Sequence, residues 1–405
     1  MLIINRPPND TFTMRMFVRL TSQIKQPIDR IYMWSPILEP NYKHTETISR
    51  WTQYGFGELD WTEDPSIVIE HNELKYRHMI LDLIKRDTVV IGLKDHLTTG
   101  NFNPWLEDCP TVARSIRGLF ECFDDKKFVL FTSMENLEEY IKLDNLSIIP
   151  WGGDITNQIF EYKSLSPILD KDFNSPYTFV SLNRNYRHPR AILLSLLFGL
   201  GIHKHGMISC MFKDSITNLT KEIKWPFTSE QKKILNKGFR KFKNSDLLIN
   251  DDLEIYQNHN NDNYSNFQNK LSKYYKQTFV EIVNETSYTE KAFNLTEKTL
   301  NSIYGCNFPI ILSSKGTVSF LRNMGLDLFD DIINHDYDSI EDPIDRMFAA
   351  LRDNQELLTN NTRTKLLWQE NKNRFLNNVS FVKDTMYNFY EKRAEEKFSK
   401  VLRDL

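Results

Sequence analysis

Short runs of β-branched and aromatic residues recur along the chain, and stretches with helical periodicity separate most of them. The runs are five or six residues long, and they are 66–70, 88–92, 127–131, 146–150, 177–182, 279–283 and 308–312. Strands of a parallel sheet are buried on both faces, so they read as near-continuous apolar runs joined by helices. The sequence therefore predicts an α/β fold with two Rossmann-like domains that face a cleft.

The helical patterns and the breaks between them predict the domain organisation. Helical spacing occurs at 74–84, 134–141, 190–199, 296–304, 316–324 and within 364–405. A Trp-Gly-Gly-Asp turn at 151–154 interrupts the first series. We expect an N-terminal domain at 1–165, a C-terminal domain at 166–362 with an insertion at 215–270, and a helical segment at 363–405.

Composition excludes several classes of protein. With 40% hydrophobic residues among 405, the chain has enough apolar material for packed cores and is not expected to be disordered. The 51 basic and 54 acidic residues give a net charge of −3, so an acidic ligand has to meet a local cation cluster. The four cysteines form no Cys-x-x-Cys pair, which argues against a cysteine zinc site.

The apolar segments also predict where in the cell the protein is located. The longest apolar stretch, 191–200, is too short to span a bilayer, so no membrane span is expected. The first eight residues have neither a basic region nor an apolar core of the signal-peptide type. We therefore expect a cytoplasmic protein, located in the host cytoplasm if the source is viral.

A cluster of cations follows the predicted strand at 177–182. Arg184, Arg187, His188 and Arg190 stand at the start of the next helix. Helix N-termini favour anions, and guanidinium groups bind phosphate oxygens in pairs. The segment therefore predicts a phosphate site, although a polar helix start with solvated arginines is the simpler alternative.

A second polar cluster follows the strand at 279–283. Glu285 comes directly after the strand, and Thr296, Glu297 and Lys298 stand at the next helix start. Thr296 can cap that helix, Glu297 can accept hydrogen bonds from a ribose diol, and Lys298 can neutralise a phosphate. Both clusters contain cations and both follow predicted strands. We therefore expect the two clusters to bind one diphosphate between them.

This second segment resembles the donor-binding motif of the α1,3-fucosyltransferase family. The motif begins with a strand, which is followed by Glu-Asn-Ser or a similar tripeptide and a short loop. The sequence Tyr-Val-Thr-Glu-Lys then leads into a helix. A turn of small residues and a strand that starts with Pro-Ile or Pro-Val complete the motif. The corresponding elements here are Glu285-Thr-Ser287, Thr296-Glu297-Lys298 and 305–311. Segments 316–325 and 329–342 also resemble stretches of uncharacterised viral and bacterial proteins. The resemblance covers about 70 residues.

The resemblance implies a GT-B-type glycosyltransferase that uses a nucleotide-diphosphate sugar as co-substrate and no separate cofactor. Glu297 and Lys298 would hold the ribose and the diphosphate, and Arg190, with Arg184 and Arg187 beside it, would supply further phosphate contacts. Asn294 stands where the family has Tyr, and the loop after Glu285 is about two residues longer. The resemblance therefore extends to nucleotide-sugar binding and not to one base or sugar.

Inverting transfer also needs a general base, which is normally a carboxylate of the N-terminal domain. A His-x-Glu follows the equivalent strand in related proteins, which favours Glu73 with His71 beside it. Other acids after predicted strands or turns remain alternatives: Glu70, Asp95 and Asp154. No Asp-x-Asp stands at a strand end, and His71 and His96 lack ligand spacing, so no metal site is expected.

The acceptor remains open between a glycan, a protein and DNA. Segment 221–243 holds eight basic and two acidic residues, interleaved with four aromatic ones. It is either a solvated helix face or a surface that attracts a polyanion such as DNA. The alternatives to a general glycosyltransferase are therefore a phage-type transferase acting on hydroxylated DNA bases and a non-catalytic binding or structural protein with a degenerate donor cleft.

Overall fold

The computed structural model describes thirteen stretches of the chain. They are residues 2–5, 30–32, 88–92, 127–132, 135–139, 144–150, 152–183, 187–210, 226–245, 249, 267–285, 288 and 293–404. The chain divides into two compact units. The first comprises Met1–Phe160, Glu290–Asn294 and Tyr387–Leu405, and the second comprises Glu161–Thr289 and Leu295–Met386.

The first unit contains a five-stranded sheet in which every pairing is parallel. Its strands are β1 (Leu2–Asn5), β2 (Arg30–Tyr32), β3 (Thr88–Gly92), β4 (Lys127–Thr132) and β5 (Leu146–Pro150). The strand order is β2-β1-β3-β4-β5. Phe128, Val129 and Ile149 are buried, as expected for strands covered on both faces.

The C-terminal helix α18 (Tyr387–Asp404) belongs to this first unit. Gly152 has a φ of +64°, and a Cβ there would lie 2.4 Å from a ring carbon of Tyr390, so the aromatic ring needs this glycine. Arg393 of α18 donates to the buried Glu135 at 2.5 Å. The Lys127 ammonium donates to the Asp404 carbonyl at 2.7 Å. These contacts fix α18 against the first unit.

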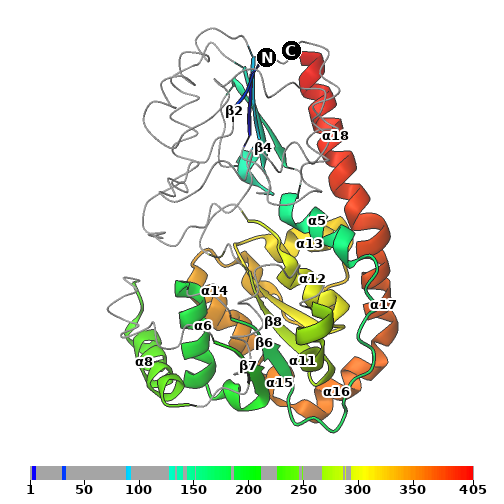
Figure 1. Cartoon of the computed structure of the whole chain (residues 1–405). Helices are drawn as coiled ribbons and strands as arrows, with labels where there is room; N and C mark the ends of the chain where they lie inside the picture. The colour runs from blue at the N-terminus through cyan, green and yellow to red at the C-terminus, as the bar shows by residue number, and fades with distance from the viewer. Residues whose placement is uncertain are drawn as a thin grey trace. The chain divides into compact units, whose positions relative to one another are not determined.

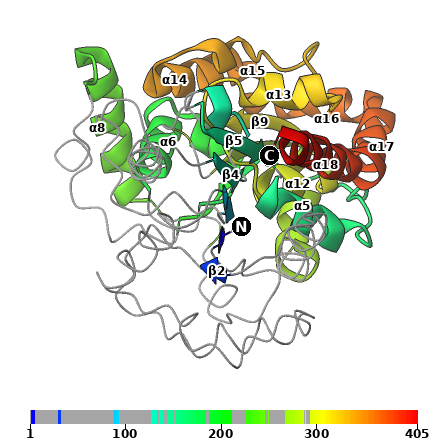
Figure 2. The same cartoon turned by 90° about the horizontal axis from the view of Figure 1, so that it is seen from above.

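The second unit contains a four-stranded parallel sheet with the order β7-β6-β8-β9. Its strands are β6 (Phe179–Ser181), β7 (Gly206–Ile208), β8 (Val280–Asn284) and β9 (Phe308–Leu312), and all their residues are buried. The helices α6 (His188–Gly199) and α14 (Pro343–Asp353) lie on one side of this sheet, and α12 (Glu297–Tyr304) and α17 (Lys372–Phe381) lie on the other (Figures 1 and 2).

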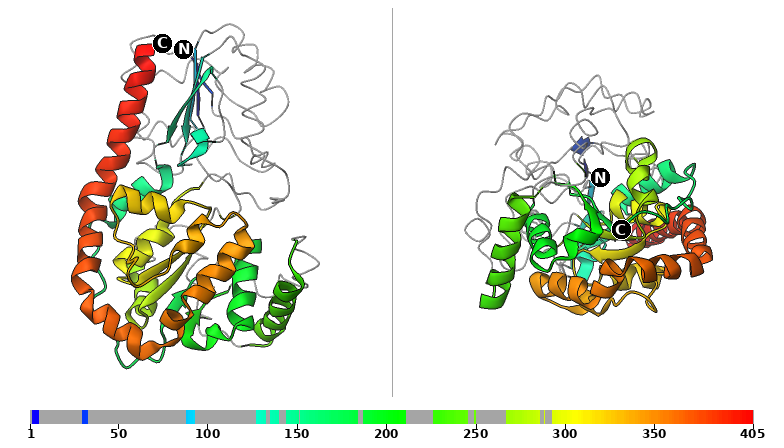
Figure 3. Two further views of the ribbon diagram at one scale, coloured as in Figure 1. Left: turned by 180° about the vertical axis from the view of Figure 1, so that it is seen from behind. Right: turned by 90° about the horizontal axis from the view of Figure 1, so that it is seen from below.

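The remaining helices surround this core. They are α5 (Gly153–Tyr162), α8 (Ser229–Lys243), α11 (Ser272–Lys276), α13 (Thr317–Met324), α15 (Gln355–Thr359), α16 (Asn361–Glu370), 3₁₀ turns at Leu137–Glu139, Ile202–His205 and Asp336–Ser339, and π turns at Phe267–Leu271 and Val382–Met386. From Asn361 to Asp404 the chain is almost continuously helical (Figure 3).

The edge strand β9 is covered by residues 335–337, in the segment that precedes α14. Pro309 has no N–H to donate, which suits a strand at the edge of a sheet. The N–H of Ile311 donates to the Tyr337 hydroxyl at 3.0 Å, and the His335 Nε2 lies 3.5 Å from the Pro309 carbonyl oxygen. Because these side chains satisfy outward-facing backbone groups, the edge of β9 is protected from pairing with another strand.

Lys171 ties the ends of three elements together inside the second unit. Its side chain is buried, and its Nζ lies within hydrogen-bond distance of four acceptors: the carbonyls of Tyr275 (2.8 Å), Thr278 (2.9 Å) and Gly305 (2.7 Å) and the Asn307 Oδ1 (2.5 Å). Burial lowers the pKa of Lys171 to about 7, so it is these hydrogen bonds to the C-terminal carbonyls of α11 and α12 that hold the helix ends together.

Helix α8 packs against α6 at two glycines. A Cβ on Gly238 would lie 1.7 Å from the Ser195 carbonyl oxygen, and one on Gly199 would lie 2.6 Å from the Ile234 carbonyl oxygen. The missing side chains thus allow the two backbones to approach. Leu235 and Phe242 are buried in the same contact. α8 lies on the side of α6 that faces away from the sheet (Figures 1 and 2).

The expected mixed α/β architecture, with parallel sheets and C-terminal helices, is confirmed. Two local predictions differ from the structure: α5 begins at Gly153, inside the turn expected at 151–154, and the helix expected at 134–141 is, in its described residues, a 3₁₀ turn at Leu137–Glu139. Gly152 supplies the turn, and the helix follows at once. The predicted strand at 66–70 and helix at 74–84 lie outside the described residues.

Candidate functional site

Polar residues follow β6 and β8 at the carboxyl edge of the second sheet. The backbone N–H of Asn183 donates to the Ser209 hydroxyl at 2.9 Å, and the Asn284 side chain donates to the Asn183 Oδ1 at 3.4 Å. β6 and β8 are neighbours, so these amides connect adjacent strand ends. In open α/β sheets this edge is where ligands bind. The helices α6 and α12 both begin here.

Glu285 anchors the start of α12. Its buried carboxylate accepts hydrogen bonds from the hydroxyls of Thr296 (2.5 Å) and Thr299 (2.7 Å) and from both backbone N–H groups (3.3 Å each). The carboxylate therefore satisfies N–H groups that a helix start leaves without an intrahelical partner. Glu285 holds the helix in place from behind, and its oxygens are engaged by the protein itself.

Lys298 lies over this helix start. Its ammonium donates to the Thr296 hydroxyl at 2.8 Å and to the Glu297 carboxylate at 3.1 Å, and it lies 4.0 Å from Glu285 Oε2. The side chain is 19% exposed, so the charge is fixed by neighbours and still reaches the surface. Thr296 is the N-cap residue and accepts from the Lys298 backbone N–H as well.

Arg190 belongs to the same electrostatic cluster. Burial raises the pKa of Glu297, but the charge and hydrogen bond of Lys298 and the charge of Arg190 outweigh it, and the pKa lies below its ordinary value. Arg190 stands in the first turn of α6 and is 4% exposed. The first turns of two helices that follow neighbouring strands thus bring two cations to one carboxylate.

The other predicted residues have different positions. Arg187 is the extended N-cap residue of α6 and is half-buried. Asn294 is buried and belongs to a short stretch of the first unit. Arg184, Glu73 and His71 lie outside the described residues. The cluster defined by Arg190, Glu285, Thr296, Glu297 and Lys298 is called the α12 cluster below.

Glu281 is a neighbour of this cluster that sequence reasoning missed. It lies within β8 and accepts a hydrogen bond from the Tyr275 hydroxyl at 2.8 Å. Burial raises the pKa of Glu281 to about 8, because the Tyr275 and Ser302 hydrogen bonds and the Lys298 charge offset only part of that effect. The signal in the sequence was an acidic residue inside the apolar run 279–283. Burial therefore favours the protonated form of this carboxyl.

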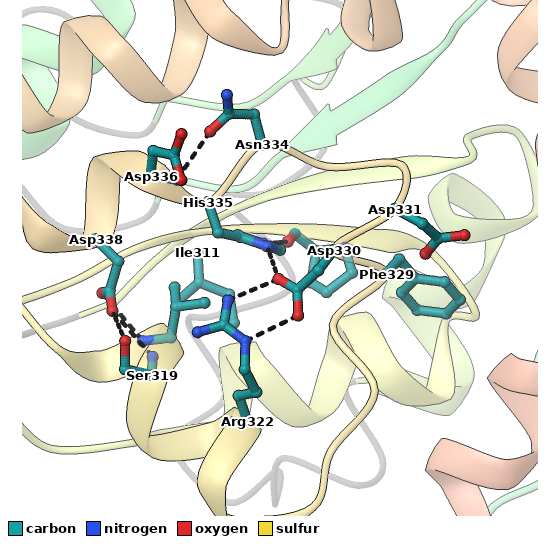
Figure 4. Close-up of polar contacts among 12 residues, drawn as sticks. Ile311, Ser319, Arg322, Phe329, Asp330, Asp331, Asn334, His335, Asp336 and Asp338 are labelled. Atoms are coloured by element: carbon teal, nitrogen blue, oxygen red, sulfur yellow. Dashed lines mark hydrogen bonds and ion pairs between the residues drawn. The ribbon is translucent and has the colours of Figure 1, made fainter.

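A second polar region borders α13 and the segment at 330–339, around a hollow of about 710 Å³ (Figure 4). Arg322 donates to both oxygens of Asp330 (2.8 and 2.6 Å), and the His335 Nδ1 lies 2.9 Å from Asp330. The Arg322 hydrogen bonds lower the pKa of Asp330 to about 2, and burial lowers the pKa of His335. Asp338 accepts from the N–H groups of Val318 and Ser319 at the start of α13.

The groups around this hollow mainly satisfy one another. They hold the 330–339 segment between α13 and the edge of β9, which is a structural task (Figure 4). We therefore place the candidate ligand site at the α12 cluster, where cations and helix starts converge.

No group of three or more His, Cys, Asp or Glu side chains in the described stretches of the chain is arranged to hold a metal ion. No helix there combines the length and the apolarity needed to cross a membrane. Comparison of the chain with protein-family models, curated proteins and solved structures finds no match.

Proposed function

We propose that the chain is an inverting glycosyltransferase that moves a sugar from a nucleotide-diphosphate sugar to an acceptor hydroxyl. The observation that carries the proposal is that Arg190 and Lys298 stand in the first turns of α6 and α12, two helices that follow the adjacent strands β6 and β8, and that both charges lower the pKa of Glu297. Negative charge develops on the leaving diphosphate as the glycosidic bond breaks, and fixed cations stabilise that charge. Side chains of the chain would perform this task without a metal ion.

Each member of the α12 cluster has a role in the proposal. Lys298 and Arg190 bind the diphosphate oxygens, helped by the positive ends of α6 and α12. Glu297 turns from Lys298 to the ribose diol when the diphosphate arrives. Glu285 and Thr296 position the helix start and do not contact the ligand. Glu73, beside His71, stays the predicted general base.

The charge balance of the cluster supports an anionic ligand. Arg190 and Lys298 are offset by Glu297 and Glu285, and the Glu285 oxygens are occupied by two hydroxyls and two N–H groups. Arg187 adds a further positive charge at the start of α6. Together with the two helix dipoles, this leaves a surplus of positive potential at the carboxyl edge.

Calorimetric titration with a panel of nucleoside diphosphates tests the proposal. We expect one of them to bind the wild-type chain, and Lys298→Ala to weaken binding by about 10- to 100-fold, the effect of one charge-assisted hydrogen bond. Lys276→Ala is the matched control, because Lys276 is half exposed and pairs only at the surface with Asp170. The control should bind like wild type.

The alternative of a non-catalytic protein gives a different result. If no nucleoside diphosphate binds the folded wild-type chain, the donor site is absent and the glycosyltransferase proposal fails. If binding occurs and Lys298→Ala leaves it unchanged, the role of Lys298 is wrong. If binding occurs and depends on Lys298, release of the nucleotide from donor sugars then identifies the sugar.

A further inference from the structure

Helix α8 carries a dense row of cations on its solvent side. The exposed members are Lys232, Lys233, Lys237, Arg240 and Lys241, which we call the α8 face. Within the part of the chain that the structure describes, no carboxylate pairs with any of the five. The only acidic residue of α8 is Glu230, in its first turn. A chain with a net charge of −3 thus concentrates positive charge on one helix.

Arg240 and Lys241 lie in the last turn of α8, where cations complement the helix dipole, but the spacing of the lysines works against the helix. Lys233, Lys237 and Lys241 follow one another at four-residue intervals, and like charges at that spacing destabilise a helix by a few tenths of a kcal/mol per pair. By contrast, Lys392 on α18 has Glu396 four residues later, at 3.7 Å. Residues that disfavour their own helix without stabilising the fold elsewhere are expected at functional surfaces.

Other features hold α8 in place despite the repulsion. Thr228 and Gln231 form a reciprocal capping box at its start. Gly238 allows the close contact with α6 described above. The cations are therefore presented on a helix that is anchored by its other face.

The positive potential extends beyond α8. His203 follows α6, and burial lowers its pKa with further contributions from the charges of Lys241 and Lys204. Lys204 is itself exposed. The α8 face therefore continues toward the turn at Ile202–His205.

The density of the charges matches a nucleic acid strand. Lys232 and Lys241 are nine positions apart, so the five cations span about 13.5 Å of helix axis, with a mean spacing of about 3.4 Å. Each strand of a duplex carries one phosphate per about 3.4 Å. A rigid row of cations can therefore neutralise several successive phosphates at once.

The packing of α8 argues against a membrane as the partner. Amphipathic helices that bind bilayers insert their apolar face. Leu235 and Phe242 on the apolar face of α8 are buried against α6. Among the described residues, the large hydrophobic side chain that is exposed is Leu366, on α16 and not on α8.

We propose that the α8 face is a docking surface for the phosphate backbone of a nucleic acid strand, bound without regard to base sequence. Lysine and arginine contacts of this kind supply affinity and salt dependence but no base readout. The inference goes beyond the donor site and does not rest on it.

Fluorescence anisotropy of the full chain with a labelled 20-nucleotide single-stranded DNA tests the proposal. Between 50 and 200 mM salt, we expect the logarithm of the association constant to fall with log salt concentration at a slope of about −3, from four to five phosphate contacts. Replacing Lys233, Lys237 and Arg240 with Gln should reduce the slope by about 2 units and weaken binding at least tenfold at low salt.

The matched control changes the same number and types of charge on another helix. Lys392, Lys400 and Arg403 are exposed on α18, and their replacement with Gln alters the net charge equally. This control should bind DNA like wild type. Circular dichroism should show both variants folded, since all six side chains are exposed.

Three results would overturn the proposal. One is the absence of binding to the oligonucleotide by the wild-type chain at 50 mM salt. Another is an equal loss in the α8 and α18 variants, which would show an effect of net charge only. The third is binding to phosphatidylserine-containing vesicles without binding to DNA, which would assign the α8 face to a lipid surface.

Discussion

Two buried glutamates, one in each unit, are stabilised in opposite ways. Glu135 of the first unit is paired with Arg393 of α18, whose guanidinium also lies 5.1 Å from the Tyr390 ring. Glu285 of the second unit is surrounded by the hydroxyls and backbone N–H groups of Thr296 and Thr299. One carboxylate uses a cation, and the other uses mainly neutral donors.

The difference separates a structural ion pair from a ligand site. Arg393 is committed to Glu135, so that pair connects α18 to the first unit and leaves little charge for a partner. At the α12 cluster, neutral donors occupy the Glu285 oxygens. Lys298 lies 4.0 Å from Glu285 and instead forms its closer ion pair with Glu297, at 3.1 Å, where the side chain is 19% exposed. A buried anion held mainly by neutral groups thus leaves the neighbouring cation close to the surface.

The largest effect in this comparison is expected from Arg393→Met. The substitution leaves the Glu135 carboxyl buried without its cation, and burial already raises the pKa of Glu135 against the influence of Arg393. Removing one partner of a buried pair destabilises a protein by about 3–5 kcal/mol. Urea unfolding at pH 7 measures the loss.

The double variant Arg393→Met with Glu135→Gln sharpens this result. Gln removes the charge, so the double variant should recover most of the loss if the buried charge is its cause. If the double variant is as unstable as Arg393→Met alone, packing of the arginine on Phe389 and Tyr390 is what matters and the ion-pair interpretation is wrong.

A smaller effect is expected from Glu285→Gln. The amide nitrogen would replace one acceptor oxygen, so the helix start would lose one or two hydrogen bonds to a charged group, about 1–3 kcal/mol. Thr296 and Lys298 would lose their fixed positions, so nucleoside diphosphate binding should weaken as well. Urea unfolding and calorimetric titration measure both quantities.

Glu341→Gln provides the control for this second experiment. Glu341 is an exposed acid that pairs with Lys315 at the surface, and such changes alter stability by less than about 0.5 kcal/mol. If Glu285→Gln behaved like Glu341→Gln in both measurements, the anchoring role of Glu285 would be refuted.

Sequence patterns located the longer apolar strands best. The runs at 88–92, 146–150 and 308–312 coincide with β3, β5 and β9. Strands as short as β7, with three residues Gly-Met-Ile, have no run to recognise and depend on pairing with β6. Helix α5 was missed because adjacent glycines at 152 and 153 indicate a turn, whereas in the structure only Gly152 turns the chain and Gly153 is the first residue of the helix.

The candidate site was partly accessible to the same reasoning. Position after a strand was enough to select Arg190 and Lys298, since parallel strands end at one edge. The partners of Glu285 are 11 and 14 residues away along the chain, and no spacing rule relates them. The state of Glu281 depends on burial between elements that are distant in sequence, which local patterns do not reveal.

Glu281 is a buried carboxyl stabilised in a third way, by protonation. Its substitution is expected to have the smallest effect on the free energy of unfolding. Burial raises the pKa of Glu281 to about 8, while an unfolded chain has a glutamate pKa of about 4.3. The folded state therefore holds a proton that the unfolded state releases. Its contribution to stability is complete below about pH 4.3 and is lost progressively as the pH rises through about 8.

Glu281→Gln removes this titration and keeps the acceptor for the Tyr275 hydroxyl. Between pH 6 and pH 7, the wild-type free energy of unfolding should fall relative to that of the variant by about 1.4 kcal/mol, the value for one proton. Urea titrations of both proteins at each pH measure the difference. If the free energies of unfolding of the two proteins changed equally with pH, Glu281 would be ionised in the folded state. The distinction between a protonated carboxyl and one held by neutral donors, as Glu285 is, would then fail at this position.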